Sequence, residues 1–321
     1  MIKKIGVLTS GGDSPGMNAA VRAVIRAGIK QGCEMYAIFE GYKGLVEGKI
    51  KKVDRSFVSG IVQRGGTVLH SARLREFKEE ETRKIGIAQL KKHGIEALVV
   101  IGGDGTYLGA KKLTEMGVNC IGLPGTIDND IASTDYTIGF DTCLNTICYC
   151  VDKLRDTTES HQRCSIIEVM GNKCGDLALF SGIAEGAEMI ITNDHPIPEA
   201  EIMKTLSELK QKKKKHDAMI IVSENVFDDI KEFAKRVTDE TGFEARAEVL
   251  GHLQRGGSPS AFDRILAARM GVYAIDLLLD GKGGVCIGIV NNHLVYYDIY
   301  EALQLPRNKH ISLLEIINTL K

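Results

Sequence analysis

Two aspartates at the end of a short apolar run are the first residues of this chain that could do chemistry. The segment NCIGL, residues 119–123, has the composition of a buried strand, and PGTIDND, residues 124–130, follows it directly. A carboxylate beside a reacting hydroxyl can accept its proton late in a phosphoryl transfer, which typically contributes about 10²–10⁴-fold to the rate. We predict that Asp128 is such a base. In an extended segment Asp130 points to the same side and could orient the water molecules of a metal ion. The alternative is a pair of turn-forming aspartates.

Two glycine-rich loops could hold phosphate groups. GGDSPG, residues 11–16, and GGDGT, residues 102–106, each follow an apolar run and precede a helical pattern. Successive backbone N–H groups ahead of a helix N-terminus form an anion site. Neither GxxxxGK[ST] nor GxGxxG occurs in the sequence, which excludes the P-loop and the dinucleotide fingerprint. Either loop taken alone could equally be a tight turn.

GGDGT carries an aspartate inside the predicted phosphate turn. A carboxylate is repelled by phosphates unless a cation lies between them, and Mg²⁺ is commonly held by one or two carboxylates together with substrate phosphates. Asp104 is therefore predicted to be a Mg²⁺ ligand. The alternative is an aspartate that caps the following helix.

The elements that must position these loops alternate between strands and helices along the whole chain. This alternation predicts an α/β fold with parallel-rich sheets flanked by helices, and ligands of such sheets bind beyond the carboxyl ends of the strands. The three loops follow strands and are expected to converge. Strands are predicted at 4–10, 34–41, 96–101, 119–126, 164–171, 188–194, 218–224 and 244–250, with a hairpin at 283–299. Helices are predicted at 18–32, 79–94, 106–117, 141–157, 176–186, 198–215, 228–242, 262–281 and after Pro306.

The composition is that of an ordinary globular protein. The chain has 321 residues, 44% of them hydrophobic and 26% charged, which is enough for two domains. A net charge of −1 provides no basic field for nucleic acid, and no apolar run approaches the length of a membrane span. The eight cysteines include no CxxC pair, so reduced thiols in a reducing cytosol are favoured over disulfides or a zinc site.

Seven segments, in this order, resemble the bacterial ATP-dependent 6-phosphofructokinase family. They are GVLTSGGDSPGMNA, LVVIGGDGT, GLPGTIDNDI, TDYTIGFDT, SHQR, EVMG and VLGHLQRGGSPSAFDR, and the resemblance extends from residue 1 to about 305. It implies transfer of the γ-phosphoryl group of ATP, with Mg²⁺, to the 1-hydroxyl of fructose 6-phosphate. It also implies an ATP-binding domain at 1–140 plus 253–304 and a sugar-phosphate domain at 141–252 plus 305–321.

The resemblance assigns the following roles residue by residue. Asp128 is the proton acceptor, Arg73 stabilises charge and Asp104 holds Mg²⁺. Asp130 is added to the catalytic residues because of its position beside Asp128. The ATP contacts are Gly12, Arg73, Leu74, Gly103, Asp104, Gly105 and Thr106. The sugar-phosphate contacts are Thr126, Ile127, Asp128, Arg163, Met170, Gly171, Glu224, Arg246, His252 and Arg255, with Arg163 and Arg246 coming from a neighbouring subunit.

Three positions separate this chain from relatives. The family usually has MGR where this chain has MGN, so Asn172 replaces an arginine near the transferring phosphate, and an amide cannot neutralise developing charge. Either Arg73 and Mg²⁺ neutralise that charge, or the activity is reduced. Pyrophosphate-dependent relatives have GGDD and PKTIDND, whereas Gly105 and Gly125 stand here, which favours ATP.

The resemblance further implies a cytoplasmic homotetramer with an effector pocket between subunits. In the family this pocket takes ADP as activator and phosphoenolpyruvate as inhibitor. Its residues are Arg22, Arg26, Arg55, Arg155, Glu188, Lys212, Lys214, Lys215 and His216. By itself, the KKKK run at 212–215 is typical of a solvated helix end.

Two rival functions remain open from the sequence. A kinase acting on NAD or a lipid shares the GGDGT turn but not PGTIDND or HLQRGG. A catalytically silent nucleotide sensor would use the Arg22/Arg26 pocket, and Asn172 is the only feature in its favour.

Overall fold

The computed structural model describes residues 2–211 and 215–320 of the chain and divides it into two compact units. Unit 1 comprises Met1–Thr142 and Arg255–Arg307, and unit 2 comprises Cys143–Gln254 and Asn308–Lys321. These boundaries lie two or three residues from those expected from the sequence. Lys212 and Lys214 of the predicted effector pocket lie outside the described residues.

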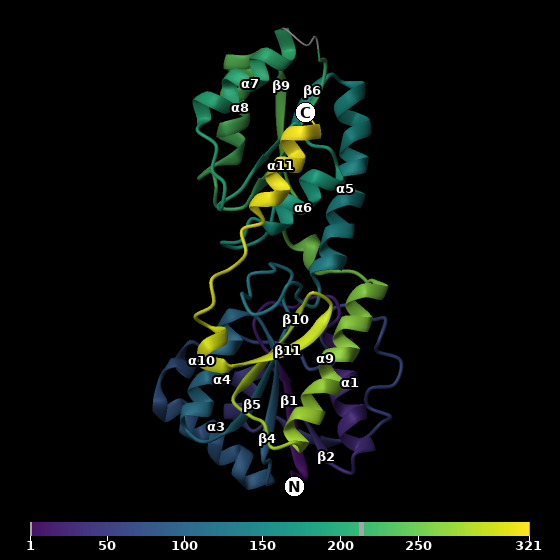
Figure 1. Cartoon of the computed structure of the whole chain (residues 1–321), viewed down its shortest axis with the longest axis vertical. Helices are drawn as coiled ribbons and strands as arrows, with labels where there is room; N and C mark the ends of the chain where they lie inside the picture. Colours follow the sequence, from purple (N-terminus) through teal and green to yellow (C-terminus); the bar gives the residue numbers. More distant parts are fainter. Residues whose placement is uncertain (1, 212–214, 321) are drawn as a thin grey trace. The chain divides into compact units, whose positions relative to one another are not determined.

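The helices and strands alternate through both units (Figure 1). The strands are β1 (Lys4–Thr9), β2 (Glu34–Ile38), β3 (Ile50–Val53), β4 (Ala97–Gly102), β5 (Asn119–Pro124), β6 (Arg163–Val169), β7 (Met189–Ile191), β8 (Ala218–Ser223), β9 (Glu244–Val249), β10 (Val285–Val290) and β11 (His293–Asp298). The helices are α1 (Met17–Lys30), α2 (Gly41–Glu47), α3 (Glu80–His93), α4 (Asp104–Glu115), α5 (Phe140–Ser160), α6 (Asp176–Ala184), α7 (Glu199–Gln211), α8 (Ile230–Thr241), α9 (Ala261–Leu279), α10 (Ile299–Ala302) and α11 (Ile311–Leu320), with 3₁₀ turns η1 (Arg75–Lys78) and η2 (Gly251–Arg255).

The predicted α/β fold is confirmed, and every predicted strand and helix is present. β3, α2, α10, η1 and η2 were not predicted, because they are short and have no clear hydrophobic period.

Unit 1 is built on a seven-stranded sheet of order β11-β10-β5-β4-β1-β2-β3. Its central strands run parallel, and β3 and β11 form antiparallel edges. The side-by-side order β5-β4-β1 has a direct consequence for the site. The carboxyl ends of these three strands lie at one edge of the sheet, and each strand is followed by one of the chemically suggestive loops.

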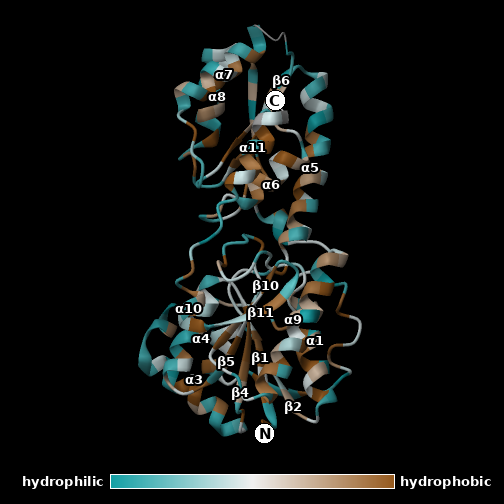
Figure 2. Ribbon diagram, in the orientation of Figure 1, coloured by the Kyte–Doolittle hydropathy of each residue, from teal (hydrophilic) through white to brown (hydrophobic). Residues whose placement is uncertain are grey.

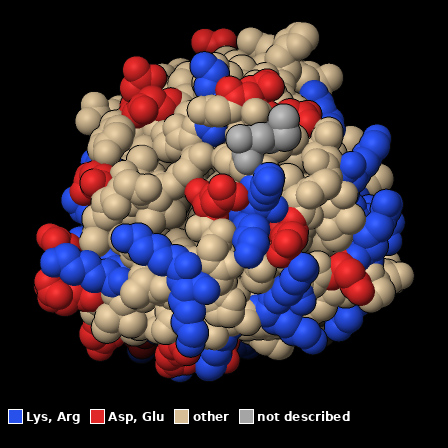
Figure 3. Space-filling model, turned by 90° about the horizontal axis from the view of Figure 1, so that it is seen from below, with Lys and Arg blue, Asp and Glu red and all other residues tan. Residues whose placement is uncertain are grey.

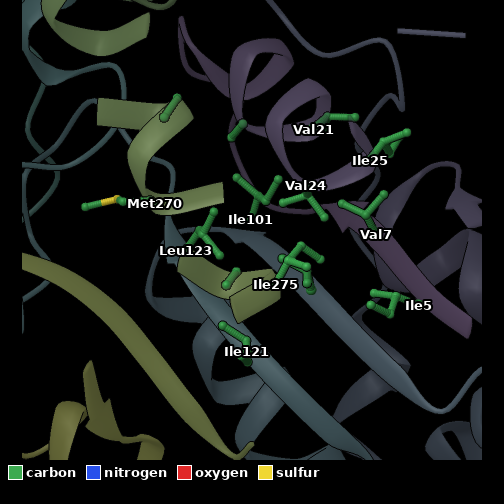
Figure 4. Close-up of a cluster of buried hydrophobic side chains, with 14 of the residues drawn as sticks. Ile5, Val7, Val21, Val24, Ile25, Ile101, Ile121, Leu123, Met270 and Ile275 are labelled. Carbon is green, nitrogen blue, oxygen red and sulfur yellow. The ribbon is translucent and has the colours of Figure 1, made fainter. Parts of the chain in front are cut away.

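An apolar cluster holds this sheet against α1 and α9. Figure 4 shows Val24 of α1 beside Val7 of β1. Val21, Ile25 and Ile5 belong to the same cluster, together with side chains of β4, β5 and α9. Burying side chains of this size stabilises the fold by about 1.5–3 kcal/mol each. A second cluster packs on the other face of the sheet beneath α2, α3 and α4. The central strands are accordingly hydrophobic along most of their length (Figure 2).

Unit 2 contains a four-stranded parallel sheet of order β7-β8-β6-β9. Side chains from this sheet and from α7 and α8 form its core, with Phe233 and Phe243 fully buried. β9 is an edge strand, and β6 lies between β8 and β9.

A fully buried carboxylate, Asp263, stabilises unit 1 at the start of α9. It accepts hydrogen bonds from Gly139 N (2.8 Å), Thr142 N (2.8 Å) and Thr142 Oγ1 (2.5 Å). Burial raises its pKa to about 6 against the opposing effect of these donors. Ser260 caps α9 and donates to Asp141 Oδ2 at 2.5 Å.

We expect Asp263→Ala to lower the free energy of unfolding by about 2–4 kcal/mol, because two buried backbone N–H groups lose their acceptor. Urea unfolding measures this loss. Asp276→Ala is the matched control, since Asp276 is an exposed acid of the same helix, and it should stay within about 0.5 kcal/mol of the parent chain. Equal stability of the two variants would contradict the stabilising role given to Asp263.

The surface mixes charges of both signs. On the face seen in Figure 3, lysine and arginine are interspersed with aspartate and glutamate. None of the helices within residues 2–211 and 215–320 combines the length and apolar composition needed to cross a bilayer. All eight cysteines lie within the described residues as thiols. Six of them are buried, and Cys148 and Cys150 of α5 are partly exposed.

Candidate functional site

The three loops after β1, β4 and β5 meet at one edge of the sheet in unit 1, as predicted. Ser10 N donates to Ile101 O (3.0 Å), and Thr106 Oγ1 donates to Ser10 O (3.0 Å), which joins the first two loops. Gly125 N donates to Gly102 O (3.1 Å), which joins the second loop to the third. The loops that carry Gly12, Asp104 and Asp128 are therefore joined to one another.

Asp104 is the first residue of α4, and Gly103 occupies the N-cap position. The alternative prediction that Asp104 caps this helix is wrong. Although Asp104 is exposed on one side, its pKa is raised to about 6, first by its partial removal from water and second by the charge of Asp130. The β4 loop and the β5 loop thus bring two carboxylates into electrostatic contact.

The extended conformation on which the same-side prediction for Asp128 and Asp130 depended is not present after β5. The chain bends at Ile127 and Asp128, and Asn129 has a left-handed φ of 51°. Asparagine tolerates this region better than most residues. Thr126 Oγ1 accepts a hydrogen bond from Asp128 N (3.1 Å), and Asp128 is buried. Side-chain alternation therefore does not set the directions of Asp128 and Asp130; the bend does.

The residues at this edge fit a magnesium ion. Asp104 and Asp130 supply carboxylate oxygens, which are the ligands that Mg²⁺ prefers. Their mutual repulsion contributes to the raised pKa of Asp104, and a divalent cation would relieve it.

The other predicted ATP residues of unit 1 lie around the first glycine loop. Ser71 Oγ donates to Gly11 O (2.5 Å), which holds the segment leading to Arg73 and Leu74 against that loop. Arg73 is exposed. Arg255, predicted to bind the sugar phosphate, donates to Asp13 O (3.2 Å), and its guanidinium fills the space that a Cβ at Gly12 would need.

Unit 2 gathers a second set of predicted residues after β6 and β8. Glu224 Oε1 accepts hydrogen bonds from Gly171 N (3.1 Å) and Asn172 N (2.7 Å). Met170 N donates to Gln254 Oε1 (3.1 Å), and the fully buried Gln254 also donates to Gly251 O (2.9 Å). Gln254 was not predicted, and its position inside HLQRGG was the only available signal. His252, in the same 3₁₀ turn, is exposed.

Asn172 adopts a left-handed φ of 56°. Its carbonyl accepts from Asn193 Nδ2 and Asn225 Nδ2, each at 3.3 Å. The turn is thus held through its backbone, and asparagine is well suited to this conformation.

Arg163 and Arg246 do not join Met170, Gly171 and Glu224 within one chain. Arg163 begins β6 and Met170 follows its end, so about 20 Å of strand separates them. Arg163 Nη2 lies 3.0 Å and Arg246 Nη2 lies 2.5 Å from Glu244 Oε1. The two arginines form a pair of their own around this carboxylate.

The predicted effector residues fall into two groups. In unit 1, Arg22 has its pKa lowered by burial and then by the charges of Arg26 and Arg55, so three cations lie close together. In unit 2, Lys215 pairs with Glu188, which also accepts from Met219 N at 2.6 Å. Arg155 binds the carbonyl of Glu185 and lies 3.6 Å from Met219 Sδ, while His216 is exposed.

A second group of potential metal ligands lies in unit 2. The ligand atoms of Cys174, Asp176 and Asp194 lie within 4.8 Å of one another. His310 Nε2 is 3.4 Å from Asp176 Oδ2, and Lys309 Nζ is 4.0 Å from Asp194 Oδ1. A basic side chain therefore stands beside each of these two carboxylates.

Comparison with known proteins gives one consistent result. The sequence matches the family described as Phosphofructokinase over residues 4–278. It is 58% identical over 304 residues to the ATP-dependent 6-phosphofructokinase of Photobacterium profundum, covering 95% of this chain and 94% of that protein. The corresponding enzyme of Vibrio campbellii is 59% identical with the same coverage. The structure resembles phosphofructokinase from Saccharomyces cerevisiae with a TM-score of 0.90 and 36% identity, covering 98% of this chain and 50% of that one.

Proposed function

Because the chain belongs to the phosphofructokinase family, we propose that it is an ATP-dependent 6-phosphofructokinase, which converts fructose 6-phosphate to fructose 1,6-bisphosphate. The observation that carries this proposal is the meeting of the Asp104 and Asp128 loops at one sheet edge, in a chain 58% identical to curated enzymes of that name.

The mechanism is direct transfer between bound substrates. Asp128 accepts the proton of the sugar 1-hydroxyl as that oxygen bonds to phosphorus. Arg73 stabilises the negative charge of the phosphoryl group. The backbone of Gly12, Gly103 and Gly105 binds the ATP phosphates. Asp104 and Asp130 would hold Mg²⁺, which supplies charge neutralisation on the phosphate oxygens.

The two glycines that distinguish phosphoryl donors support ATP. A Cβ at Gly105 would meet nothing within 4 Å, so the glycine leaves open space beside the predicted phosphate site. A Cβ at Gly125 would lie 2.9 Å from Ile101 Cγ2 and 3.3 Å from Met17 Cε. A lysine at this position, as in the pyrophosphate-dependent pattern, would require the apolar layer to move.

Unit 1 is proposed to bind ATP, and unit 2 to carry Met170, Gly171, Glu224 and His252 for the sugar phosphate. Arg163 and Arg246 lie at the opposite end of β6 from Met170. This separation supports their donation to a neighbouring subunit's site in a homotetramer. The two cationic groups support an effector pocket for ADP and phosphoenolpyruvate. A glycolytic enzyme with these thiols is assigned to the cytoplasm.

A coupled assay of ADP release tests the function. We expect rapid ADP release from ATP, Mg²⁺ and fructose 6-phosphate, and none when NAD replaces the sugar. Pyrophosphate in place of ATP should give no sugar bisphosphate. Activity on NAD would favour the rival kinase, and inactivity on both acceptors would favour a nucleotide sensor.

A further inference from the structure

The segment TIGFDT, residues 137–142, follows the PGTIDND loop and has no role in the mechanism proposed above. It packs directly against that loop. Ile138 N donates to Pro124 O (2.8 Å), and Ile138 forms an isolated parallel bridge with Gly125. The two segments are therefore joined where β5 ends.

Thr137 makes two contacts that bracket Asp128. Its Oγ1 donates to Thr126 O (2.7 Å), and its backbone N donates to Asn129 Oδ1 (3.0 Å). Thr137 is fully buried, so water does not compete for either bond. Asn129 Nδ2 in turn donates to Asp135 O (3.2 Å), which fixes the side chain of this left-handed residue.

The remainder of TIGFDT is anchored to other parts of unit 1. Ser14 Oγ, from the first glycine loop, donates to Ile138 O (2.9 Å), and both atoms are buried. Asp263 accepts from Gly139 N and Thr142 N, each at 2.8 Å. The segment thus connects a predicted phosphate loop and the α9 N-terminus to the Asp128 loop through hydrogen bonds.

We propose that Thr137 is a positioning residue that, together with Asn129, holds Asp128 in place for proton transfer. This inference rests on the proposed function. A base acts only within hydrogen-bond reach of the proton it accepts, and a displacement of about 1 Å can cost about 10²-fold in rate. Thr137 acts through the backbone on both sides of Asp128 and needs no contact with either substrate.

The test compares Thr137→Val with Thr134→Val. Thr134 is a buried threonine of the same region, but its Oγ1 donates to Tyr136 O (2.8 Å) and accepts from Ile289 N (3.0 Å), so it supports β10 rather than the Asp128 loop. We expect Thr137→Val to lower kcat by about tenfold to hundredfold. KM for ATP should change by no more than about twofold, because the predicted ATP contacts lie on other loops. KM for the sugar phosphate should change less than kcat, because its predicted contacts in unit 2 remain.

Thr137→Ser keeps the hydroxyl, so its kcat should be close to that of the parent chain. Thr134→Val should also keep the parent kcat, although its melting temperature should fall about as much as that of Thr137→Val. If a valine variant does not fold, the corresponding alanine pair replaces it. Equal kcat losses in the Thr137 and Thr134 variants, or no loss in either, would overturn the proposal.

Hydrogen exchange separates this inference from the proposed function. The Asp128 and Thr137 amides should exchange faster in Thr137→Val than in Thr134→Val, whatever reaction the enzyme catalyses. If the parent chain does not phosphorylate fructose 6-phosphate, the proposed function fails. The exchange rates of these amides then decide by themselves whether Thr137 holds the Asp128 loop. Equal rates in both variants would refute this role of Thr137.

Discussion

Asp128→Ser is expected to lower kcat by about 10²–10⁴-fold, the usual contribution of a positioned base. KM for fructose 6-phosphate should change little, because the other sugar contacts predicted in unit 2 are untouched. Steady-state kinetics with both substrates varied measure this result. A loss confined to kcat identifies an interaction that matters in the transition state rather than in substrate binding.

Asp135→Ser is the matched control for this variant. Asp135 lies in the chain segment after PGTIDND, is exposed, and accepts a hydrogen bond from Asn291 N (2.8 Å). Its replacement removes one carboxylate from the same region and should leave kcat within about twofold. Unchanged turnover in Asp128→Ser, with an intact melting temperature, would remove Asp128 from the mechanism.

The sequence was sufficient to predict which loops share a site. Apolar runs that end in glycine or aspartate mark strand ends, and the carboxyl ends of adjacent parallel strands lie at one edge of a sheet. The order β5-β4-β1 confirms that the three loops converge. Asp104 and Asp130 are separated by 25 other residues of sequence, yet the charge of one raises the pKa of the other.

The residues that hold the loops could not be predicted in the same way. Asp263 lies 124 residues from Gly139 in sequence, and Gln254 lies 84 residues from Met170. A single buried polar residue carries no periodic signal, so its partners become known only from the fold. The bend at Ile127 and Asp128 was given only as an alternative, because strand alternation was extended into a loop, although asparagine between two aspartates is typical of turns.

Asp104→Asn should reduce Mg²⁺-dependent turnover by about 10²–10³-fold, since a metal ion commonly supplies several kcal/mol of charge stabilisation. Its folded-state pKa is raised from 3.8 to about 6. The metal-free protein therefore loses stability at this carboxyl as pH rises from 3.8 to 6. The asparagine variant avoids that loss, so its melting temperature at pH 7.5 should not fall. A large drop would show that the activity was lost through unfolding.

The pH dependence of Mg²⁺ activation gives the sharper test of Asp104. Mg²⁺ binds the charged carboxylate. The affinity of the site for Mg²⁺ should therefore be highest above pH 7 and should fall as pH decreases through about 6. ATP also titrates in acid, which makes the wild-type profile ambiguous by itself. Asp130→Asn resolves this ambiguity, because it removes one of the two causes of the raised pKa and leaves ATP unchanged. Since Asp130 is also a proposed Mg²⁺ ligand, the quantity compared is the midpoint of the pH profile and not the absolute Mg²⁺ affinity.

The midpoint of Mg²⁺ activation should therefore move to lower pH in Asp130→Asn than in the parent chain. The shift should be partial, because removal of Asp104 from water is the larger cause and persists in the variant. Coincident midpoints would mean that the titration belongs to ATP or to another group. Asp104 would then lose its assignment as the metal ligand, and the convergence of the β4 and β5 loops would need a different chemical explanation.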